Sequence, residues 1–402
     1  MQDGRVQKRS SECLRRGGAG IFGVKKRKRE ADIHRRRALF LINSLAGGGA
    51  ERVMCTLLRH SEPMRARYDI ILALLDREPA AYSPPDWVEV RELECGGSML
   101  TSIRKVRALH AELRPDVALS FLNRANVANV LAAKGACVIS ERSNASAHLP
   151  GLRNLPARTL VSLTYPHADR VIAVSGGVAD DLAQNFGVPR NKLVSIANPI
   201  DVETIEAKAE AEPSYKPDGD YILAAGRLVK SKNFELLIRA YAQAGLSEKL
   251  VILGEGGERA ALEALARECG VADRVSLPGF NANPYPLMRA AKLFVLSSND
   301  EGFPNALVEA MALGIPVVAT NCASGPSEIL AETPRANVRG LTFAQHGVLT
   351  PTNDVAAMIQ ALSAMDATRR AEYGARAAAR AQAYGPKIAA ERYWRVLEEV
   401  IV

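Results

Sequence analysis

This chain of 402 residues lacks three features, and each absence excludes a class of protein. It has no run of eighteen apolar residues, which a membrane-spanning helix requires. No apolar stretch near the N-terminus resembles a secretory signal peptide. The six cysteines are scattered without a Cys-x-x-Cys pair, so neither a disulfide framework nor a zinc site is indicated. We therefore expect a cytosolic protein.

The positive charge of the chain is concentrated at its N-terminus. Residues 1–37 contain thirteen lysines and arginines against four acidic residues, a net charge of +9, whereas the whole chain carries +8. The basic runs at residues 25–29 and 35–37 suit anionic lipid headgroups or nucleic acid. The alternative, which we favour, is a disordered extension or a start codon assigned too early, because this segment has little apolar pattern.

From residue 38 onward, apolar runs alternate with amphipathic stretches, as is typical of parallel sheets flanked by helices. The pattern occurs twice, and 48% hydrophobic residues are enough for two cores. The expected strands are residues 38–43, 69–75, 88–93, 117–122, 137–140, 170–175 and 193–197, then 221–226, 249–254, 274–277, 292–298 and 315–320. Residues 203–220 are polar and contain two prolines, as an exposed linker would. We predict an α/β fold with two doubly wound domains, residues 38–202 and 221–384, a cleft between them and a terminal helix over residues 385–402.

Two glutamates, Glu301 and Glu309, surround a predicted helix start. Pro304 suits the first position of a helix expected over residues 305–313. Free amides at a helix start attract phosphate, and carboxylates accept hydrogen bonds from hydroxyls. A nucleotide sugar carries both groups. The alternative is a solvated acidic turn before an ordinary amphipathic helix.

Two further loops join a strand to a helix. The first contains Gly47, Gly48 and Gly49, but Arg52 stands where a dinucleotide fingerprint has its third glycine, and no Walker lysine follows. The second contains Arg227 and Lys232, which suit a diphosphate. The alternatives are a tight turn in the first loop and solvated cations in the second.

Together, these segments resemble the family 4 glycosyltransferases. The donor half of that family is similar to residues 226–227, 232–233, 253–256, 278–280, 301–309 and 324–326, in order and spacing. Residues 43–45, 47–52 and 140–144 resemble members that extend lipid-linked glycans in bacteria. The resemblance covers residues 38–402 and implies the GT-B architecture, in which two Rossmann-like domains enclose a cleft.

The resemblance also implies a retaining transfer of a sugar from a nucleoside diphosphate donor to an acceptor hydroxyl, without a metal or other cofactor. It assigns Glu301 to the donor sugar, Glu309 to the ribose, and Arg227 with Lys232 to the leaving diphosphate. The other donor-binding residues that it implies are Gly226, Gly254, Phe280, Gly302, Phe303, Pro304 and Asn305. The residues implied for the acceptor or diphosphate loop are Gly48, Gly49, Arg52, Asn123, Glu141 and Arg142. UDP-linked N-acetylhexosamines are the preferred donors, and GDP-mannose stays open.

One position departs from the family pattern. Many members have a histidine after the strand expected at residues 117–122, whereas this chain has Asn123 and Arg124. Asparagine can bind a hydroxyl but cannot titrate, so we expect no proton transfer at this position. The six histidines form no cluster, and His148 is either near the acceptor or simply in a surface loop.

The acceptor side is less well defined. Residues 98–113 form a basic amphipathic pattern that suits an anionic membrane, or a helix covering the N-terminal sheet, which we favour for its apolar face. Residues 380–402 are expected to form a helix that returns to the N-terminal domain. We expect a lipid-linked glycan acceptor and peripheral membrane attachment, and no nucleic acid. The alternatives are a nucleotide-sugar epimerase of GT-B fold and a non-catalytic binder of nucleotide sugars or nucleic acid.

Overall fold

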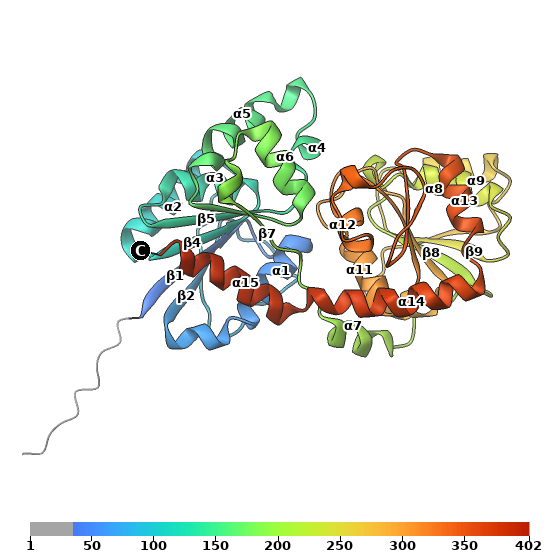
Figure 1. The fold of residues 1–402 in the computed structure, drawn as a ribbon. Helices are drawn as coiled ribbons and strands as arrows, with labels where there is room; N and C mark the ends of the chain where they lie inside the picture. The colour runs from blue at the N-terminus through green and yellow to red at the C-terminus, as the bar shows by residue number, and fades with distance from the viewer. Residues whose placement is uncertain (1–34, 402) are drawn as a thin grey trace, which may run out of the picture. The chain divides into compact units, whose positions relative to one another are not determined.

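A computed structural model describes residues 35–401, and its first half folds around a seven-stranded parallel sheet (Figure 1). The spatial order is β3-β2-β1-β4-β5-β6-β7. The strands are β1 Arg36–Ile42, β2 Tyr68–Leu74, β3 Glu89–Glu92, β4 Val117–Phe121, β5 Ala136–Glu141, β6 Arg170–Ala173 and β7 Leu193–Ser195. All seven strands expected from the sequence are present, each within two residues of its predicted bounds.

The second half contains another seven-stranded sheet, in the order β10-β9-β8-β11-β12-β14-β13. Its strands are β8 Tyr221–Ala225, β9 Lys249–Leu253, β10 Val275–Gly279, β11 Leu293–Leu296, β12 Val317–Thr320, β13 Thr342–Phe343 and β14 Val348–Thr350. The first five confirm the prediction. The sequence analysis missed β13 and β14, an antiparallel pair of two and three residues, because so short a segment carries no readable pattern. The predicted α/β class and GT-B architecture are confirmed.

Within the described residues, twelve α-helices lie between the strands and three follow the last strand. They are α1 Gly49–Arg59, α2 Met99–Leu113, α3 Asn123–Ala132, α4 Ala145–His148, α5 Leu155–Thr164, α6 Gly176–Phe186, α7 Val202–Ala209, α8 Phe234–Gln243, α9 Arg259–Glu268, α10 Tyr285–Ala290, α11 Asn305–Ala312, α12 Pro326–Leu330, α13 Val355–Ser363, α14 Ala367–Ala381 and α15 Pro386–Glu399. No helix between residues 35 and 401 is long and apolar enough to cross a membrane.

The N-terminal boundary predicted at residue 37 is wrong by two residues. Arg36 already pairs with Tyr68 of β2. The backbone amide of Arg37 donates to Asp116, and its guanidinium donates to the carbonyl of Leu113 at 2.6 Å. These arginines therefore belong to the sheet, because their neighbours satisfy their polar groups. The rest of the predicted basic extension, residues 1–34, lies outside the described residues.

The segment predicted as an exposed linker, residues 203–220, begins with a helix. Helix α7 buries Val202, Ile205 and Ala209 and contacts α10 and α11. The side chain of Asp201 caps the helix by accepting a hydrogen bond from the amide of Thr204. The apolar spacing of three and four residues was present in the sequence, but the prolines and charges that follow it favoured a linker.

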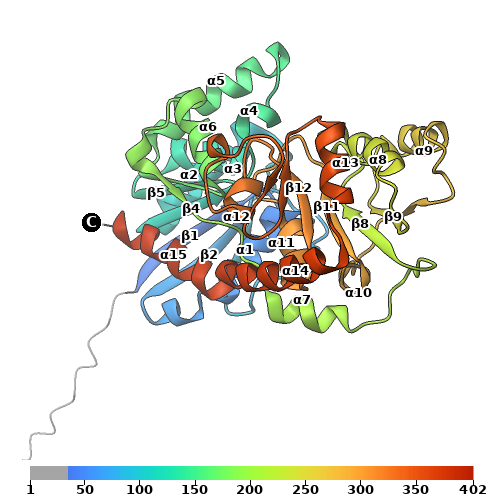
Figure 2. The ribbon, with the colours of Figure 1, turned by 45° about the vertical axis from the view of Figure 1, so that its right-hand side comes forward.

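The helix expected over residues 380–402 is two helices, α14 and α15. They separate at Gly385, whose ψ of 147° is extended, because a residue before proline avoids helical backbone. Helix α15 packs on the first half of the chain, as Figures 1 and 2 show. The indole ring of Trp394 lies 5.9 Å from Phe40 and 4.9 Å from Tyr68, ring centroid to ring centroid. The last helix is therefore part of the N-terminal core.

Candidate active site

The predicted motifs leave the two sheets where the strand order reverses. In the first sheet the reversal lies between β1, which precedes residues 47–49, and β4, which precedes residues 122–123. In the second sheet it lies between β8, which precedes residues 226–232, and β11, which precedes residues 297–304. Doubly wound sheets bind ligands outside the carboxyl ends of strands at such switch points. The fold thus places four predicted loops where a ligand is expected.

The carboxylate of Glu301 is held through one of its two oxygens. Lys232 Nζ lies 2.5 Å from Oε1, and the hydroxyl of Ser298 donates to the same oxygen at 2.7 Å. Among residues 35–401, Oε2 accepts no hydrogen bond. The pair therefore fixes the orientation of the carboxylate and leaves Oε2 able to accept a further hydrogen bond.

The loop after β8 carries two cations, of which Lys232 contacts this carboxylate. Lys232 ends a short 3-10 helix, and its stem passes 3.6 Å from the position that a Cβ would have at Gly226. Arg227 is exposed and forms no ion pair or side-chain hydrogen bond within the described residues. One cation is thus fixed by Glu301, and the other can bind a phosphate group.

Asp300, next to Glu301, is a carboxylate that the sequence analysis did not consider. Its Oδ1 is buried without a hydrogen-bond partner among the described residues. Burial, and then the neighbouring Glu301 carboxylate, raise the pKa of Asp300 to about 6, although Lys232 and His148 act in the opposite direction. His148 is exposed, yet it lies close enough to influence Asp300.

A pocket of about 340 Å³ opens between the loops that follow β8, β9 and β10. Gly226, Gly254 and the exposed Phe280 line it, together with Leu253 and Pro284. Gly254 has a φ of 142°, and a Cβ at this residue would lie 1.9 Å from the carbonyl oxygen of Gly226. Only glycine permits this close packing. The pocket has the position and the flat apolar wall that suit a nucleobase.

Glu309 lies inside α11 and is 6% exposed. Arg52 of α1 donates to its Oε1 at 2.6 Å and lies 3.4 Å from the hydroxyl of Tyr285. Burial alone would lower the pKa of Arg52, but Glu309 and Tyr285 outweigh it, so the pKa is raised and the guanidinium stays charged. We expected Arg52 on the acceptor or diphosphate loop and did not foresee this pair.

The turn before α11 touches the first half of the chain at two further points. A Cβ at Gly302 would lie 2.3 Å from the carbonyl oxygen of Arg142, so only glycine fits. A Cβ at Gly49 would lie 3.2 Å from the side-chain nitrogen of Asn305. The predicted loop containing Gly48 and Gly49 therefore faces the donor motif.

Three other residues predicted for the site, Pro304, Phe303 and Glu141, have roles within the fold. Pro304 precedes α11 as its N-cap residue instead of occupying the first helical position. The ring of Phe303 is 8% exposed and packs edge-on against Tyr384 at 5.3 Å, so its side chain belongs to the core. The carboxylate of Glu141 is also occupied: Oε2 accepts from the hydroxyl of Tyr165 at 2.9 Å, and Oε1 accepts from the amides of its own loop.

Asn123 begins α3 directly after a strained residue. Leu122 has a φ of 74°, in the region that favours glycine. The side chain of Asn123 lies close enough to the buried Tyr165 hydroxyl to influence the pKa of that phenol. Arg124 forms an ion pair with Asp76. Asn123 thus lies at the switch point, whereas the side chain of Arg124 is paired with Asp76, after β2.

The sequence analysis missed two residues that connect the halves of the chain. The carboxylate of Glu328 in α12 accepts from the backbone amides of Gly176 at 2.6 Å and Gly177 at 2.9 Å, at the start of α6. Asn198, after β7, donates to Asn305 at 2.7 Å. Neither residue belongs to a motif that could have identified it.

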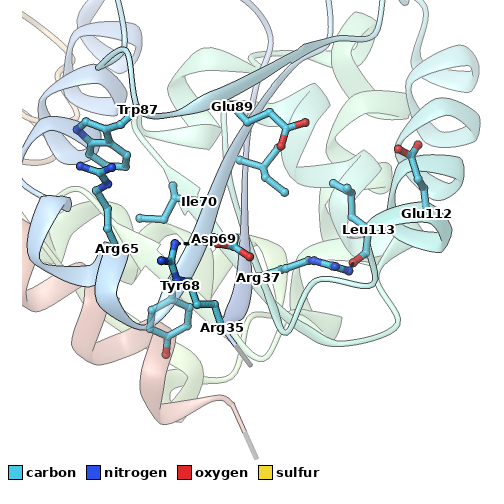
Figure 3. Close-up of a pocket in the computed structure, with 11 residues that line it drawn as sticks. Arg35, Arg37, Arg65, Tyr68, Asp69, Ile70, Trp87, Glu89, Glu112 and Leu113 are labelled. Atoms are coloured by element: carbon cyan, nitrogen blue, oxygen red, sulfur yellow. Dashed lines mark hydrogen bonds and ion pairs between the residues drawn. The ribbon is translucent and has the colours of Figure 1, made fainter. Parts of the chain in front are cut away.

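A separate cavity of about 460 Å³ lies at the opposite, amino ends of the strands in the first sheet (Figure 3). Its cations have partners: Arg35 pairs with Asp69, and Arg65 lies over the ring of Trp87, 5.0 Å from the centroid, and pairs with Glu62. Because these charges are balanced locally and the motifs lie elsewhere, this cavity is not the candidate site.

Comparisons with known proteins show the family to which this chain belongs. The family described as glycosyl transferases group 1 matches residues 206–380, and glycosyltransferase family 4 matches residues 47–204. A Campylobacter jejuni protein, N-acetylgalactosamine-N,N'-diacetylbacillosaminyl-diphospho-undecaprenol 4-alpha-N-acetylgalactosaminyltransferase, is 34% identical over 361 residues, which cover 85% of this chain and 94% of the relative. This chain is a family 4 glycosyltransferase.

Further comparisons extend the likeness. The lipopolysaccharide core biosynthesis glycosyltransferase LpsE of Rhizobium meliloti is 30% identical over 55% of this glycosyltransferase and 60% of LpsE. Among solved structures, Anabaena HepE in complex with UDP has a TM-score of 0.69 at 22% identity, covering 90% of this chain and all of HepE. The latter likeness shows the shared fold.

Proposed function

We propose that this glycosyltransferase moves a sugar, with retention of configuration, from a UDP-sugar to a hydroxyl of a lipid-linked glycan. The observation that carries the proposal is the arrangement of Glu301 and Glu309 around the start of α11, with Lys232 bonded to Glu301 and Arg227 on the same loop as Lys232. Carboxylates that accept from hydroxyls and cations that bind phosphates suit the two parts of a nucleotide sugar.

UDP-N-acetylhexosamine is the proposed donor. The Campylobacter jejuni relative is by its name an N-acetylgalactosaminyltransferase, and HepE was solved with UDP. In our proposal the nucleobase enters the pocket beside Phe280, Glu309 binds the ribose, and Glu301 Oε2 accepts from a sugar hydroxyl. Backbone groups of residues 302–305 bind the rest of the sugar.

The transfer would break the bond between the sugar C1 and the phosphate oxygen and form a bond from C1 to the acceptor oxygen on the same face. The acceptor proton passes to the departing phosphate, so no protein base is required. Negative charge grows on that phosphate in the transition state, where Arg227 and Lys232 stabilise it. Because these two cations supply the positive charge, we propose that no metal is needed, and that activity persists in excess EDTA.

The acceptor would be a lipid-linked glycan at the inner face of the cytoplasmic membrane. Helices α2 and α5, which both contact α3, expose Leu100, Leu155 and Leu163 by 80%, 54% and 66%. Arg104 and Arg107 are exposed on α2. The predicted apolar face of α2 covers the sheet instead, with Val106, Leu109 and Leu113 buried. Exposed leucines beside arginines suit an anionic bilayer.

The membrane proposal is tested by sedimentation with vesicles at low salt. We expect the protein to sediment with phosphatidylglycerol vesicles and not with phosphatidylcholine vesicles. Arg104→Gln/Arg107→Gln should weaken this binding, whereas Arg339→Gln, an exposed residue of the second half, should not. Failure to sediment with anionic vesicles would contradict the proposal.

The function is tested with purified protein and a panel of UDP-, GDP- and ADP-sugars, with and without a lipid-linked acceptor. We expect one UDP-sugar to turn over, and Glu301→Gln to abolish turnover while the exposed Glu268→Gln retains it. Release of an epimerised donor without acceptor would favour the epimerase alternative. Nucleotide-sugar binding without turnover in any combination would favour the binder.

A further inference from the structure

The guanidinium of Arg142 is committed to contacts within the protein. Its Nη1 donates to the hydroxyl of Tyr393 in α15 at 2.6 Å and to the hydroxyl of Ser140 at 3.2 Å. The central carbon of the guanidinium, Cζ, lies 4.9 Å from the ring centroid of Phe121. Its Nη2 donates to the side-chain oxygen of Asn198. Because its guanidinium is bonded to these protein groups, Arg142 is poorly placed to bind a phosphate of the acceptor.

Asn198 connects Arg142 to the donor-binding half of the chain, because it is hydrogen-bonded to both Arg142 and Asn305. It is 6% exposed, and its Nδ2 donates to Oδ1 of Asn305, the first residue of α11, at 2.7 Å. Because arginine can only donate, the oxygen of the Asn198 amide must face Arg142 and its nitrogen must face Asn305. The oxygen of Asn305 is then used, and its nitrogen points to the loop containing Gly49.

The backbone next to Arg142 contacts the same turn. Gly302 packs on the carbonyl of Arg142 so closely that a Cβ would lie 2.3 Å from that oxygen. The loop is in turn held by Glu141, whose Oε1 accepts from the amide of Ser143 at 3.2 Å and from its hydroxyl at 3.1 Å. Residues 302 and 305, the two ends of the turn, thus both rest on the unit formed by Arg142 and Asn198.

We propose that Arg142 and Asn198 are positioning residues that hold the donor loop, defined as residues 302–305, in its arrangement for transfer. The unit joins the loop after β5, the segment after β7, the start of α11 and, through Tyr393, helix α15. The bond from Asn198 to Asn305 and the packing of Gly302 on Arg142 can form only when the two halves of the chain touch, so they tie correct placement of the donor loop to closure. This inference rests on the proposed function, since it concerns the same donor site.

The variant Asn198→Asp tests the direction of the hydrogen bond from Asn198 to Asn305, and it preserves the size of the side chain. The introduced carboxylate still accepts from Arg142 but cannot donate to Asn305, so the Asn305 amide must turn its nitrogen away from the glycine loop. We expect kcat for transfer to fall about tenfold or more, while the Kd for UDP changes less than twofold and Tm is unchanged. Asn337→Asp, at an exposed residue whose amide donates to the hydroxyl of Thr333 at 2.9 Å, is the matched control and should retain full activity.

Arg142→Lys separates the positioning role from an acceptor-binding role. Lysine keeps the charge but not the planar fork, so the positioning role predicts a fall in kcat with little change in acceptor KM. It also predicts that Arg142→Lys/Asn198→Asp is no slower than the slower single variant, because both break one unit. A raised acceptor KM with normal kcat would overturn the proposal.

A second measurement does not depend on turnover. Hydrogen exchange of the peptide containing residues 302–305 should be slow in the UDP-bound wild-type protein and faster in the UDP-bound Asn198→Asp variant. If wild-type protein transfers no sugar, the proposed function fails, but this comparison still tests the positioning unit. Equal protection in the two proteins, or wild-type kcat in Asn198→Asp, would overturn the inference.

Discussion

Arg52 and Glu309 are 257 residues apart in the chain, and the Nη2 of Arg52 lies 2.6 Å from the carboxylate of Glu309. The carboxylate is almost completely buried, and Arg52 is its ion-pair partner. Only Oε1 is used by the arginine. The ribose site proposed in the second half of the molecule is therefore completed by a residue from the first half.

Arg52→Ala should weaken UDP binding about tenfold, because Glu309 would lose the cation that orients it. Glu309→Gln should have a similar effect, since an amide accepts less strongly from ribose hydroxyls. We expect the double variant to bind UDP no more weakly than the weaker single variant, because the two residues act as one unit. Titration calorimetry with UDP tests this. Additive losses would mean that the two residues contribute independently.

Arg227→Ala should lower kcat by a factor of about 10² to 10³, the usual effect of removing one group that stabilises developing charge. Arg227→Lys should recover part of the activity, because lysine supplies charge without the planar fork. Steady-state kinetics with the donor that turns over in the nucleotide-sugar panel provides the measurement, and the exposed Arg339→Ala serves as control. An unchanged kcat in Arg227→Ala would remove this residue from the proposed chemistry.

Asp300→Asn should be more stable than the wild type at neutral pH. The pKa of Asp300 is raised from 3.8 to about 6, so its contribution to stability is complete below about pH 4 and is lost as pH rises through 6. The variant avoids that loss, which we place at about 1 kcal/mol after allowance for solvent screening. Urea unfolding at pH 5 and at pH 7.5 should show an advantage that grows with pH. An advantage that is constant with pH would contradict this account, and the exposed Asp273→Asn should show none.

Trp394→Ala should destabilise the first half of the molecule by about 3–5 kcal/mol, the usual cost of removing a buried aromatic side chain. The indole packs against Phe40 and Tyr68, and its Nε1 donates to the hydroxyl of Ser61 at 2.7 Å. Trp394→Phe should cost less, because a ring remains. Denaturant unfolding monitored by circular dichroism provides the measurement, with Arg395→Ala on the exposed side of α15 as control. A loss below 1 kcal/mol would show that α15 is not part of this core.

Most of the strands could be predicted because each is a continuous apolar run. Strands β4 and β11, for example, are buried at every position, as parallel strands between helices must be. The sequence analysis did not predict helix α7, because its three buried residues precede a stretch of prolines and charges that resembles a linker. The domain prediction placed the start of the terminal helix at residue 385, next to Pro386, and α15 begins there, whereas the helical pattern expected from residue 380 runs across the break.

The amino-acid sequence by itself was sufficient to predict the fold class and the four loops at the switch points. It also indicated the candidate chemistry of four residues, namely Glu301, Glu309, Arg227 and Lys232. These features are local, since a strand end, a helix start and a charged side chain within a few residues of one another are visible in a short window. The partners of these residues were decided by tertiary structure. Arg52 reaches Glu309 only because two separate sheets bring their switch points together. Arg142 turns inward to Asn198 instead of outward to an acceptor because the first sheet brings the loop after β5 close to the segment after β7. Contacts between segments so far apart leave no local periodicity in the chain, and the burial that gives them their strength exists only after folding.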